Sequence, residues 1–450
     1  LTHLLACAFG TPPWVAGGGG WVEVPLLVTV LPPQWDRGGG ITIIIQMANV
    51  GPPFVTRGGG FRPGLLKEVA VPPLLVWGGG MACLLLSFLW NHTSVIAGKS
   101  HSIAFLILTF FLSLVDCTSS VTFLPFMMQL HPPYTTRGGG GEGLSGLIPA
   151  LPPLGQGGGG SSCANVSSEV NPPTGNGGGG RTIFQLETQY LPPKFSRGGG
   201  FLLMTAMMLT CPPAFFWGGG QPKVWELSQQ QLFPSNIVLN SFDQIADEAA
   251  GPPLNSGGGG SKDPKRPGDI LPPKVSWGGG KLTFIYLLIT CPPSLTRGGG
   301  PSVQSYSCLP YGHTAYHLAA TLSSMANPLA CPPATLRGGG GGGGMGFLTT
   351  VGTGFGAYNM AIAVMSPCPL LQQSPPPDAI GGGAWVLFTG TLTYPPLMAG
   401  GGGGSRSRSA LVWYPPLEQL GGGVGALLMF PLVNPPRLFK GGGDCSLQCP

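Results

Sequence analysis

A frame of Pro-Pro, four variable residues and Gly-Gly-Gly recurs every 20 residues along most of this chain. It limits the fold because glycine costs backbone entropy and proline lacks an N–H, so neither favours the interior of a helix or strand. Gly (79) and Pro (50) make up about 29% of the 450 residues, a share typical of low-complexity chains. The in-register units begin at Pro12, Pro32, Pro52, Pro72, Pro132, Pro152, Pro172, Pro192, Pro212, Pro252, Pro272, Pro292 and Pro332.

The frame divides the chain into three predicted regions. Residues 1–344 carry it in one register, with unframed stretches at 81–120, 221–240 and 301–320. Residues 345–374 form a non-repetitive apolar segment. Residues 375–450 carry the same repeat in a shifted register, which resumes at Pro375, Pro395, Pro415 and Pro435.

The segments between the frames predict the local conformation. Decamers such as 41–50, 201–210 and 281–290 are apolar, rich in β-branched residues or leucine, and almost uncharged. Pro-Pro favours an extended path and Gly-Gly-Gly is flexible, so the frame is interpreted as a repeated breaker. We therefore predict a low-complexity Gly/Pro-rich tandem repeat, mostly irregular or extended, with short β-prone segments. A β-solenoid-like repeat is the alternative, although no core position recurs from unit to unit as stacked repeats require.

The residue before Gly-Gly-Gly points to the coding DNA. In the in-register units it is always Gly, Arg or Trp, as at Gly17, Arg37 and Trp77. These residue types share no size, charge or backbone preference, but each has a codon that ends in two guanines. After the register shifts, the codon constraint moves across the frame, as one template read in another phase requires, with Ile380 as an exception. The frame is interpreted as the translation of a repetitive C-run and G-run template, in a synthetic sequence or an incidental reading frame.

This interpretation predicts a repeat polypeptide with no selected catalytic or specific binding function. One alternative is an extracellular or filament-forming structural repeat protein, in which the frame forms the corners. Another is an engineered string of apolar peptides joined by flexible linkers. In each case the exposed apolar segments are aggregation-prone, and we expect self-association.

Composition and charge exclude several partners. Charged residues are 8% of the chain and the net charge is +5, which leaves no basic stripe for nucleic acid. The longest mostly apolar run, 103–115, falls short of the roughly 18 to 20 residues that a spanning helix needs, so no transmembrane span is predicted. The 16 acidic residues are dispersed and no Ser-His-Asp set has a supporting context. We predict no enzyme, no cofactor and no small-molecule substrate.

Two glycine motifs resemble nucleotide-binding loops only in part. Gly352, Gly354 and Ala357 follow the G-x-G-x-x-A order of a dinucleotide loop, which needs a strand before it, a helix after it and an acid about 20 residues on. The next acid, Asp378, follows three prolines. Residues 96–100 echo the end of a phosphate loop, but Thr93 stands where its earlier glycine belongs. Chance matches are the favoured interpretation of both motifs.

Candidate metal ligands are also weak. His313 and His317 are four residues apart and share a face if the segment is helical, with Cys308 nearby. Thr314 stands where a zinc-protease helix needs its glutamate, and no third ligand has a clear spacing. Cys445 and Cys449 fit neither a zinc finger nor a redox loop. No catalytic, cofactor-binding or metal residue is therefore predicted.

One short helix is predicted between the frames, within residues 221–251. Ser241 is a candidate N-cap, Gln244 its capping-box partner, and Gly251 lies where a C-terminal glycine belongs.

Overall fold

The computed structural model describes most of the chain, and every structural statement below concerns these residues. They are 8, 15–28, 31, 37–52, 71–96, 99–128, 144–156, 161–170, 181–190, 194, 196–213, 279–336, 342–369, 377–401, 408–434 and 438–440. The predicted helix around Ser241, Gln244 and Gly251 and the pair Cys445 and Cys449 lie outside them.

A first bundle of helices comes from the N-terminal part of the chain. Its longer members pack on one another, with α5 against α6 and α9, and α2 against α6 and α9. The elements are α2 (Val15–Val28), α3 (Arg37–Met47) with η2 (Ala48–Val50), α5 (Val71–Leu89), α6 (Ile103–Met128), η3 (Ile148–Ala150), α8 (Leu151–Gln156) and α9 (Arg197–Met208).

A second bundle comes from the C-terminal part. Here α17 packs between α15 and α16, and α18 packs on α13 and η4. The elements are α13 (Gly279–Pro293), the π-helical η4 (Ser294–Gly299), α14 (Gly300–Cys308), η5 (Leu309–Tyr311), α15 (His313–Leu336), α16 (Gly342–Val364), α17 (Pro377–Gly401) and α18 (Arg408–Val433).

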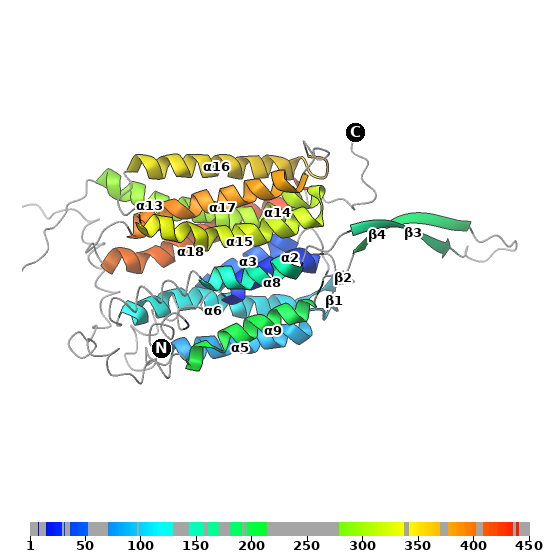
Figure 1. Cartoon of the computed structure of the whole chain (residues 1–450), viewed down its shortest axis with the longest axis horizontal. Coiled ribbons are helices and arrows are strands. Elements are labelled where there is room, and N and C mark those ends of the chain that lie inside the picture. The colour runs from blue at the N-terminus through cyan, green and yellow to red at the C-terminus, as the bar shows by residue number, and fades with distance from the viewer. Residues whose placement is uncertain are drawn as a thin grey trace, which may run out of the picture.

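The two bundles lie side by side with their helices nearly parallel (Figure 1). They meet where α2 contacts α15, and where α3 contacts α14 and α18. One continuous buried cluster runs through both bundles, with Phe201 and Met208 from the first and Tyr306 and Phe388 from the second. The interface is therefore part of the core.

Strands occur only as two antiparallel pairs among the described residues. β1 (Ser94–Ile96) pairs with β2 (Lys99–His101) between α5 and α6. β3 (Ser161–Val170) pairs with β4 (Arg181–Tyr190), and this hairpin projects beyond one end of the bundles (Figure 1).

The predicted extended repeat with β-prone decamers is wrong, and so is the β-solenoid alternative. The decamers 41–50, 201–210 and 281–290 lie mainly in α3, α9 and α13. An apolar decamer cannot be told from a buried helix segment by pattern alone, because a helix buried on all sides needs no polar face. The frame residues were interpreted as breakers, but many of those that the structure describes lie within or at the start of helices, as Gly198, Gly199 and Gly200 do in α9.

The prolines are accommodated in specific ways. Pro72 and Pro73 stand in the first turn of α5, where a missing N–H costs no intrahelical hydrogen bond. Pro292 and Pro293 end α13, and the helix continues directly as the π-helical η4. A local change of helical register of this kind re-pairs backbone groups around a proline.

Several of the described frame glycines, such as Gly298, serve as points of close helix contact. A Cβ atom on Gly298 would meet the Gly422 carbonyl and lie 2.6 Å from the Ala426 nitrogen. A Cβ on Gly425, which lies just after the frame glycines 421–423 of α18, would meet the Ser294 carbonyl. Small residues at such crossings let helix backbones approach within an apolar solvent. Gly-Gly-Gly therefore supports the packing of η4 on α18.

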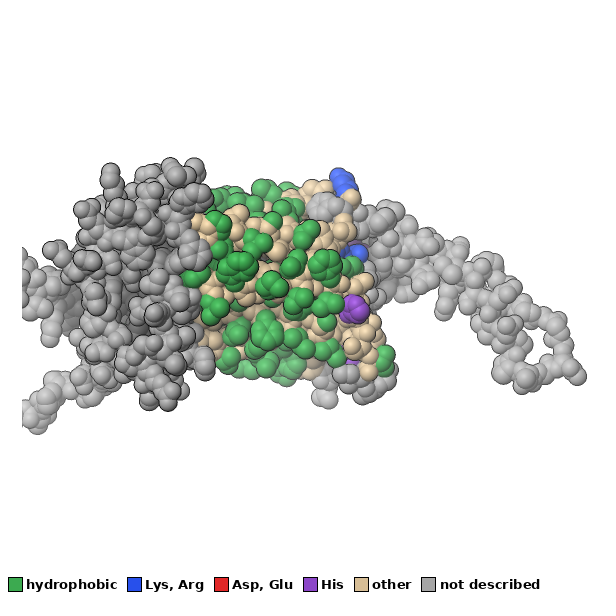
Figure 2. All heavy atoms as spheres, turned by 90° about the horizontal axis from the view of Figure 1, so that it is seen from below, with side chains coloured by type: hydrophobic (Ala, Val, Ile, Leu, Met, Phe, Trp, Pro, Cys, Tyr) green, Lys and Arg blue, Asp and Glu red, His purple; other side chains and the backbone are tan. Residues whose placement is uncertain are grey.

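The prediction of no spanning segment relied on an unbroken apolar run, and the helices show why that criterion failed. Within the described part of the chain, two stretches, Pro72–Leu89 of α5 and Pro416–Val433 of α18, are long and apolar enough to cross a membrane by length and composition. Helix α6 extends 26 residues because it continues through Asp116, Thr118 and Ser119, all of which are buried. Figure 2 shows a broad hydrophobic surface over the bundles, with Lys, Arg and His side chains at one end of it.

Candidate interface between the two bundles

Polar side chains join the two bundles along their shared interface. Buried or half-buried groups on α2, α3, η2 and α8 reach groups on η4, α14, α15 and α18. Polar groups inside such a bundle are expensive unless they are hydrogen-bonded, so their concentration at one interface marks a functional region.

Trp21 and Gln304 form a direct side-chain contact across this interface. The Trp21 indole Nε1 donates to Gln304 Oε1 at 3.3 Å, between α2 and α14. Gln304 is only 2% exposed, while Trp21 is half-buried and packs against the common core. The neighbouring serines of α14 bond inside their own bundle. Ser302 Oγ donates to the Gly298 carbonyl, and Ser307 Oγ accepts from Trp385.

A second set of contacts joins α3, η2 and α6 to η4 and α18. Gln46 Nε2 donates to the Arg297 carbonyl at 3.3 Å. Asn49 Nδ2 donates both to Gln46 Oε1 and to the Gln419 carbonyl. In the opposite direction, Gln419 Nε2 of α18 donates to the Cys117 carbonyl of α6 at 3.1 Å. Three amide side chains thus hold backbone groups of the opposite bundle.

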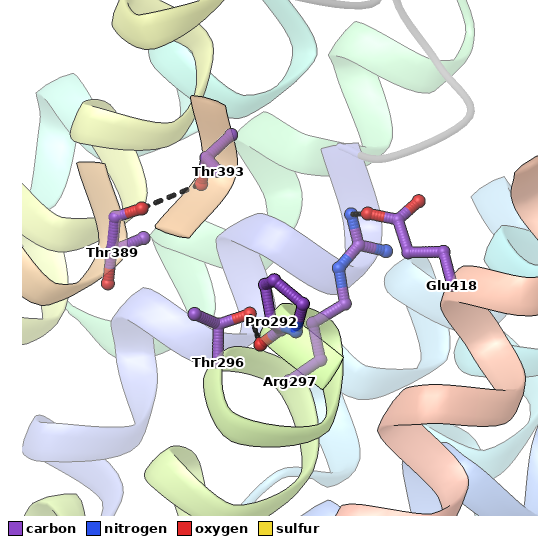
Figure 3. A network of polar contacts seen from close by, with 6 residues as sticks. All are labelled: Pro292, Thr296, Arg297, Thr389, Thr393 and Glu418. Carbon is purple, nitrogen blue, oxygen red and sulfur yellow. Dashed lines mark hydrogen bonds and ion pairs between the residues drawn. The ribbon is translucent and has the colours of Figure 1, made fainter. Parts of the chain in front are cut away.

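An ion pair stands beside this amide set. Arg297 of η4 contacts Glu418 of α18, with Nη2 and Oε1 2.7 Å apart, and the two side chains point toward each other from adjacent helices (Figure 3). Both are mostly shielded, at 31% and 14% exposure. Low exposure strengthens their attraction and also makes either charge costly without the other. The pair ties η4 to α18 where both helices meet α3.

Two carboxyl groups lie inside the first bundle. Glu23 of α2 is fully buried beside Gly200 of α9, and its oxygens have no hydrogen-bond partner within the described part of the chain. Asp116 of α6 lies against Gly17 and accepts a hydrogen bond from its backbone. Since Gly17 lies in the first turn of α2, Asp116 satisfies an N-terminal amide of that helix.

The histidine pair lies at the start of α15 but shows no metal cluster. His317 Nε2 lies 2.8 Å from the Pro153 carbonyl, so this histidine links α15 to α8 across the interface. His313 and Cys308 are both buried. No group of three His, Cys, Asp or Glu side chains suited to a metal ion occurs within the described ranges. Nε2 of His317 therefore already has a hydrogen-bond partner in the Pro153 carbonyl.

The two glycine motifs lie in structures that differ from nucleotide loops. Gly352, Gly354 and Ala357 are interior residues of the continuous helix α16, and Gly352 packs against Thr391 and Leu392 of α17. Residues 96 and 99 belong to β1 and β2, where Ile96 pairs with Lys99. The strand–loop–helix unit that either motif needs is replaced by a helix in one case and a hairpin in the other.

Comparison with known proteins extends over nearly the whole chain. The profile of the family "Solute carrier family 52, riboflavin transporter" matches residues 1–441. The chain is 48% identical over 433 residues to riboflavin transporter member 3 of Bos taurus, covering 92% of this chain and 91% of that protein. It is 45% identical over 434 residues to member 3 of Homo sapiens, with the same coverage.

The fold has a counterpart among solved structures. The xylose transporter XylE from E. coli, in a partially occluded inward-open conformation, superposes with a TM-score of 0.50 and 10% identity, covering 96% of this chain and 89% of that one. The architecture is a major facilitator-like transporter fold.

These matches correct the functional predictions. The interpretation as a template-driven repeat without selected function is wrong, as are the filament and linked-peptide alternatives, because a transporter family spans the chain. The denial of a transmembrane span and of a small-molecule substrate is wrong for the same reason. The prediction that the chain is not an enzyme is confirmed, since the relatives are transporters. The chain belongs to solute carrier family 52, the riboflavin transporters.

Proposed function

We propose that this protein carries riboflavin across a membrane, with the substrate bound between the two helical bundles. The observation that carries the proposal is the match of the riboflavin transporter family to residues 1–441, together with relatives at 45% to 48% identity over 92% of the chain. The interface described above supplies the polar groups that such a substrate needs.

The chemistry of riboflavin suits this interface. Its planar tricyclic ring has an apolar end and a polar pyrimidine end, and its ribityl chain carries hydroxyl groups. Ligand sites combine apolar and aromatic lining with a few placed hydrogen-bonding groups. Trp21 offers an aromatic surface, and Gln304, Gln46 and Asn49 offer amide groups on the same interface.

The interface contacts also suit alternating access. A transporter of two bundles opens by rocking one bundle against the other around a central site. Most cross-bundle bonds here run from a side chain to a backbone carbonyl, as Gln46 to Arg297 and Gln419 to Cys117. Neutral hydrogen bonds of this kind contribute only about 1 kcal/mol each, so these polar contacts add little to the free energy needed to part the bundles.

Uptake into reconstituted vesicles tests the proposal. The full chain is placed in liposomes and radiolabelled riboflavin uptake is followed, with protein-free liposomes as the blank. Saturable uptake that excess unlabelled riboflavin abolishes, and that excess xylose leaves unchanged, is the expected result. Riboflavin uptake no faster than in the blank, from protein that is folded by thermal melting, contradicts the proposal.

A further inference from the structure

The Trp21–Gln304 pair differs from the cross-bundle contacts of Gln46, Asn49, Gln419 and His317 described above. Gln46, Asn49 and Gln419 each donate to a backbone carbonyl of the opposite bundle, and His317 engages the Pro153 carbonyl. Trp21 to Gln304 is a bond between two side chains. When the bundles part, this bond releases a donor and an acceptor that face each other across the same gap.

The released groups form a defined hydrogen-bonding array. The Trp21 indole N–H is a donor only, while the Gln304 amide offers one acceptor oxygen and an NH₂ donor. Once separated, the pair therefore offers two kinds of N–H donor and one acceptor oxygen at the interface. The Gln304 side chain is 2% exposed, so a substrate that separates it from Trp21 must replace the lost bond or leave a buried polar group unpaired.

The flavin ring carries the complementary array. Its pyrimidine end is an imide whose edge runs carbonyl, N3–H, carbonyl, which is acceptor, donor, acceptor. We propose that Trp21 and Gln304 together recognise this imide edge and so determine specificity for flavins. The Trp21 N–H donates to one carbonyl, Gln304 Oε1 accepts from N3–H, and Gln304 Nε2 donates to the other carbonyl. This inference rests on the proposed function and adds the orientation of the ring to it.

The position of Trp21 supports this assignment. Its indole ring packs against the buried cluster shared by both bundles, which restricts the directions that the N–H can take. The bond to Gln304 is long at 3.3 Å, which makes it weaker than a typical N–H···O bond and easily replaced. A rigid donor opposite a buried amide is preorganised for a rigid planar ligand.

Substrate analogues test the contact without altering the protein. In the wild-type protein, 3-methylriboflavin has no N3–H, and we expect it to inhibit riboflavin uptake about ten-fold less well than riboflavin does, the effect of one lost hydrogen bond at a buried acceptor. 5-Deazariboflavin keeps the imide edge and changes the ring elsewhere. It is the matched control, expected to inhibit within about two-fold of riboflavin.

Two substitutions divide the array into its parts. Gln304→Met keeps the length of the side chain and removes its amide, so the preference for riboflavin over 3-methylriboflavin is expected to fall to nearly one. Trp21→Phe keeps an aromatic ring and removes the N–H, so both compounds weaken about five-fold while the preference remains. Trp77→Phe, at a 51% exposed position of α5, is the control expected to change neither value.

The outcomes separate this inference from the proposed function. If riboflavin is not taken up at all, the proposed function fails and the inference fails with it. If riboflavin uptake is saturable but 3-methylriboflavin competes as well as riboflavin in the wild-type protein, the imide contact is refuted while the transport function stands. Retention of the full preference in Gln304→Met also refutes it, and this comparison of two compounds on one protein does not depend on expression level.

Discussion

Replacing frame glycines by alanine distinguishes two structural roles of the same residue. Gly78 and Gly298 are each the first glycine of a Gly-Gly-Gly run, and both lie in a helix. A Cβ on Gly78 meets nothing within 4 Å, whereas a Cβ on Gly298 would strike the backbone of α18 at Gly422, Gly425 and Ala426. Gly78→Ala is therefore expected to stabilise the protein, and Gly298→Ala to destabilise it.

The magnitudes follow from helix propensity and packing. Alanine is favoured over glycine in a helix interior by about 1 kcal/mol, so Gly78→Ala gains roughly that amount. Gly18 and Gly346 are equally open, and the triple variant gains about 3 kcal/mol. Gly298→Ala forces η4 and α18 apart and costs about 2 kcal/mol net. For a chain of this length, a change of 1 kcal/mol in the free energy of unfolding shifts the melting temperature by about 1 °C.

Thermal melting of the detergent-solubilised protein measures these changes. We expect the triple variant Gly18→Ala, Gly78→Ala, Gly346→Ala to melt about 3 °C higher than the wild type, and Gly298→Ala to melt about 2 °C lower. A Gly298→Ala variant that melts at or above the wild-type temperature would show that the backbone contact between η4 and α18 is not a constraint. A fall in the triple variant would refute the helical assignment of those open glycines.

Three further predictions use the same assay. Glu418→Gln leaves the shielded Arg297 without its carboxylate and lowers the free energy of unfolding by about 2 kcal/mol. Adding Arg297→Gln restores part of this loss, whereas additive losses would contradict the ion pair. Gly312 has a φ of 110° and open space around it, so Gly312→Ala lowers the free energy of unfolding by about 1 to 2 kcal/mol through backbone strain alone. Gly344 is also open, and Gly344→Ala is the control that causes no loss. Equal effects of the two substitutions would refute the backbone strain. His317→Phe removes the contact with the Pro153 carbonyl and lowers stability by about 1 kcal/mol, and an unchanged melt refutes that link.

The sequence contained a clue to the fold that pattern criteria did not capture. A charged share of 8% is far below that of ordinary soluble domains and suits a bundle in an apolar solvent. The search for one unbroken apolar run failed because Asp116, Thr118 and Ser119 interrupt α6 on faces that neighbouring helices cover. Inward-facing polar residues are compatible with a spanning helix, but only the packed structure shows which residues face inward.

The frame obscured the helices for a second reason. The rule that proline breaks helices is calibrated on helices in water, where an unpaired backbone group finds a solvent partner. Without water, every backbone group must pair within the segment or its neighbours, so helices persist through prolines and glycines. Pro292 and Pro293, which begin one frame unit, are followed by a π-helical segment rather than by a break.

The candidate site could not be predicted from spacing. Trp21 and Gln304 are separated by 283 positions, and Gln46 and Arg297 by 251. No local motif connects residues so distant, and neither Trp21 nor Gln304 belongs to a titratable cluster that a search for catalytic or metal sites detects. A buried glutamine among the serines of α14 is the remaining signal, and it becomes informative only after the fold shows that Gln304 faces the other bundle.

The irregular segment η4 connects the frame to the interface. Pro292 and Pro293 end the regular α-helix, and the π-helical register that follows carries Arg297 and Gly298. Gly298 lets the backbone of α18 approach, which brings Glu418 to the Arg297 side chain. The Arg297 carbonyl meanwhile accepts from Gln46 of the other bundle. Prolines and glycines that interrupt a regular α-helix therefore lie where the two bundles meet. Irregular helical segments of this kind concentrate at functional regions, because regular helix packing alone does not require them.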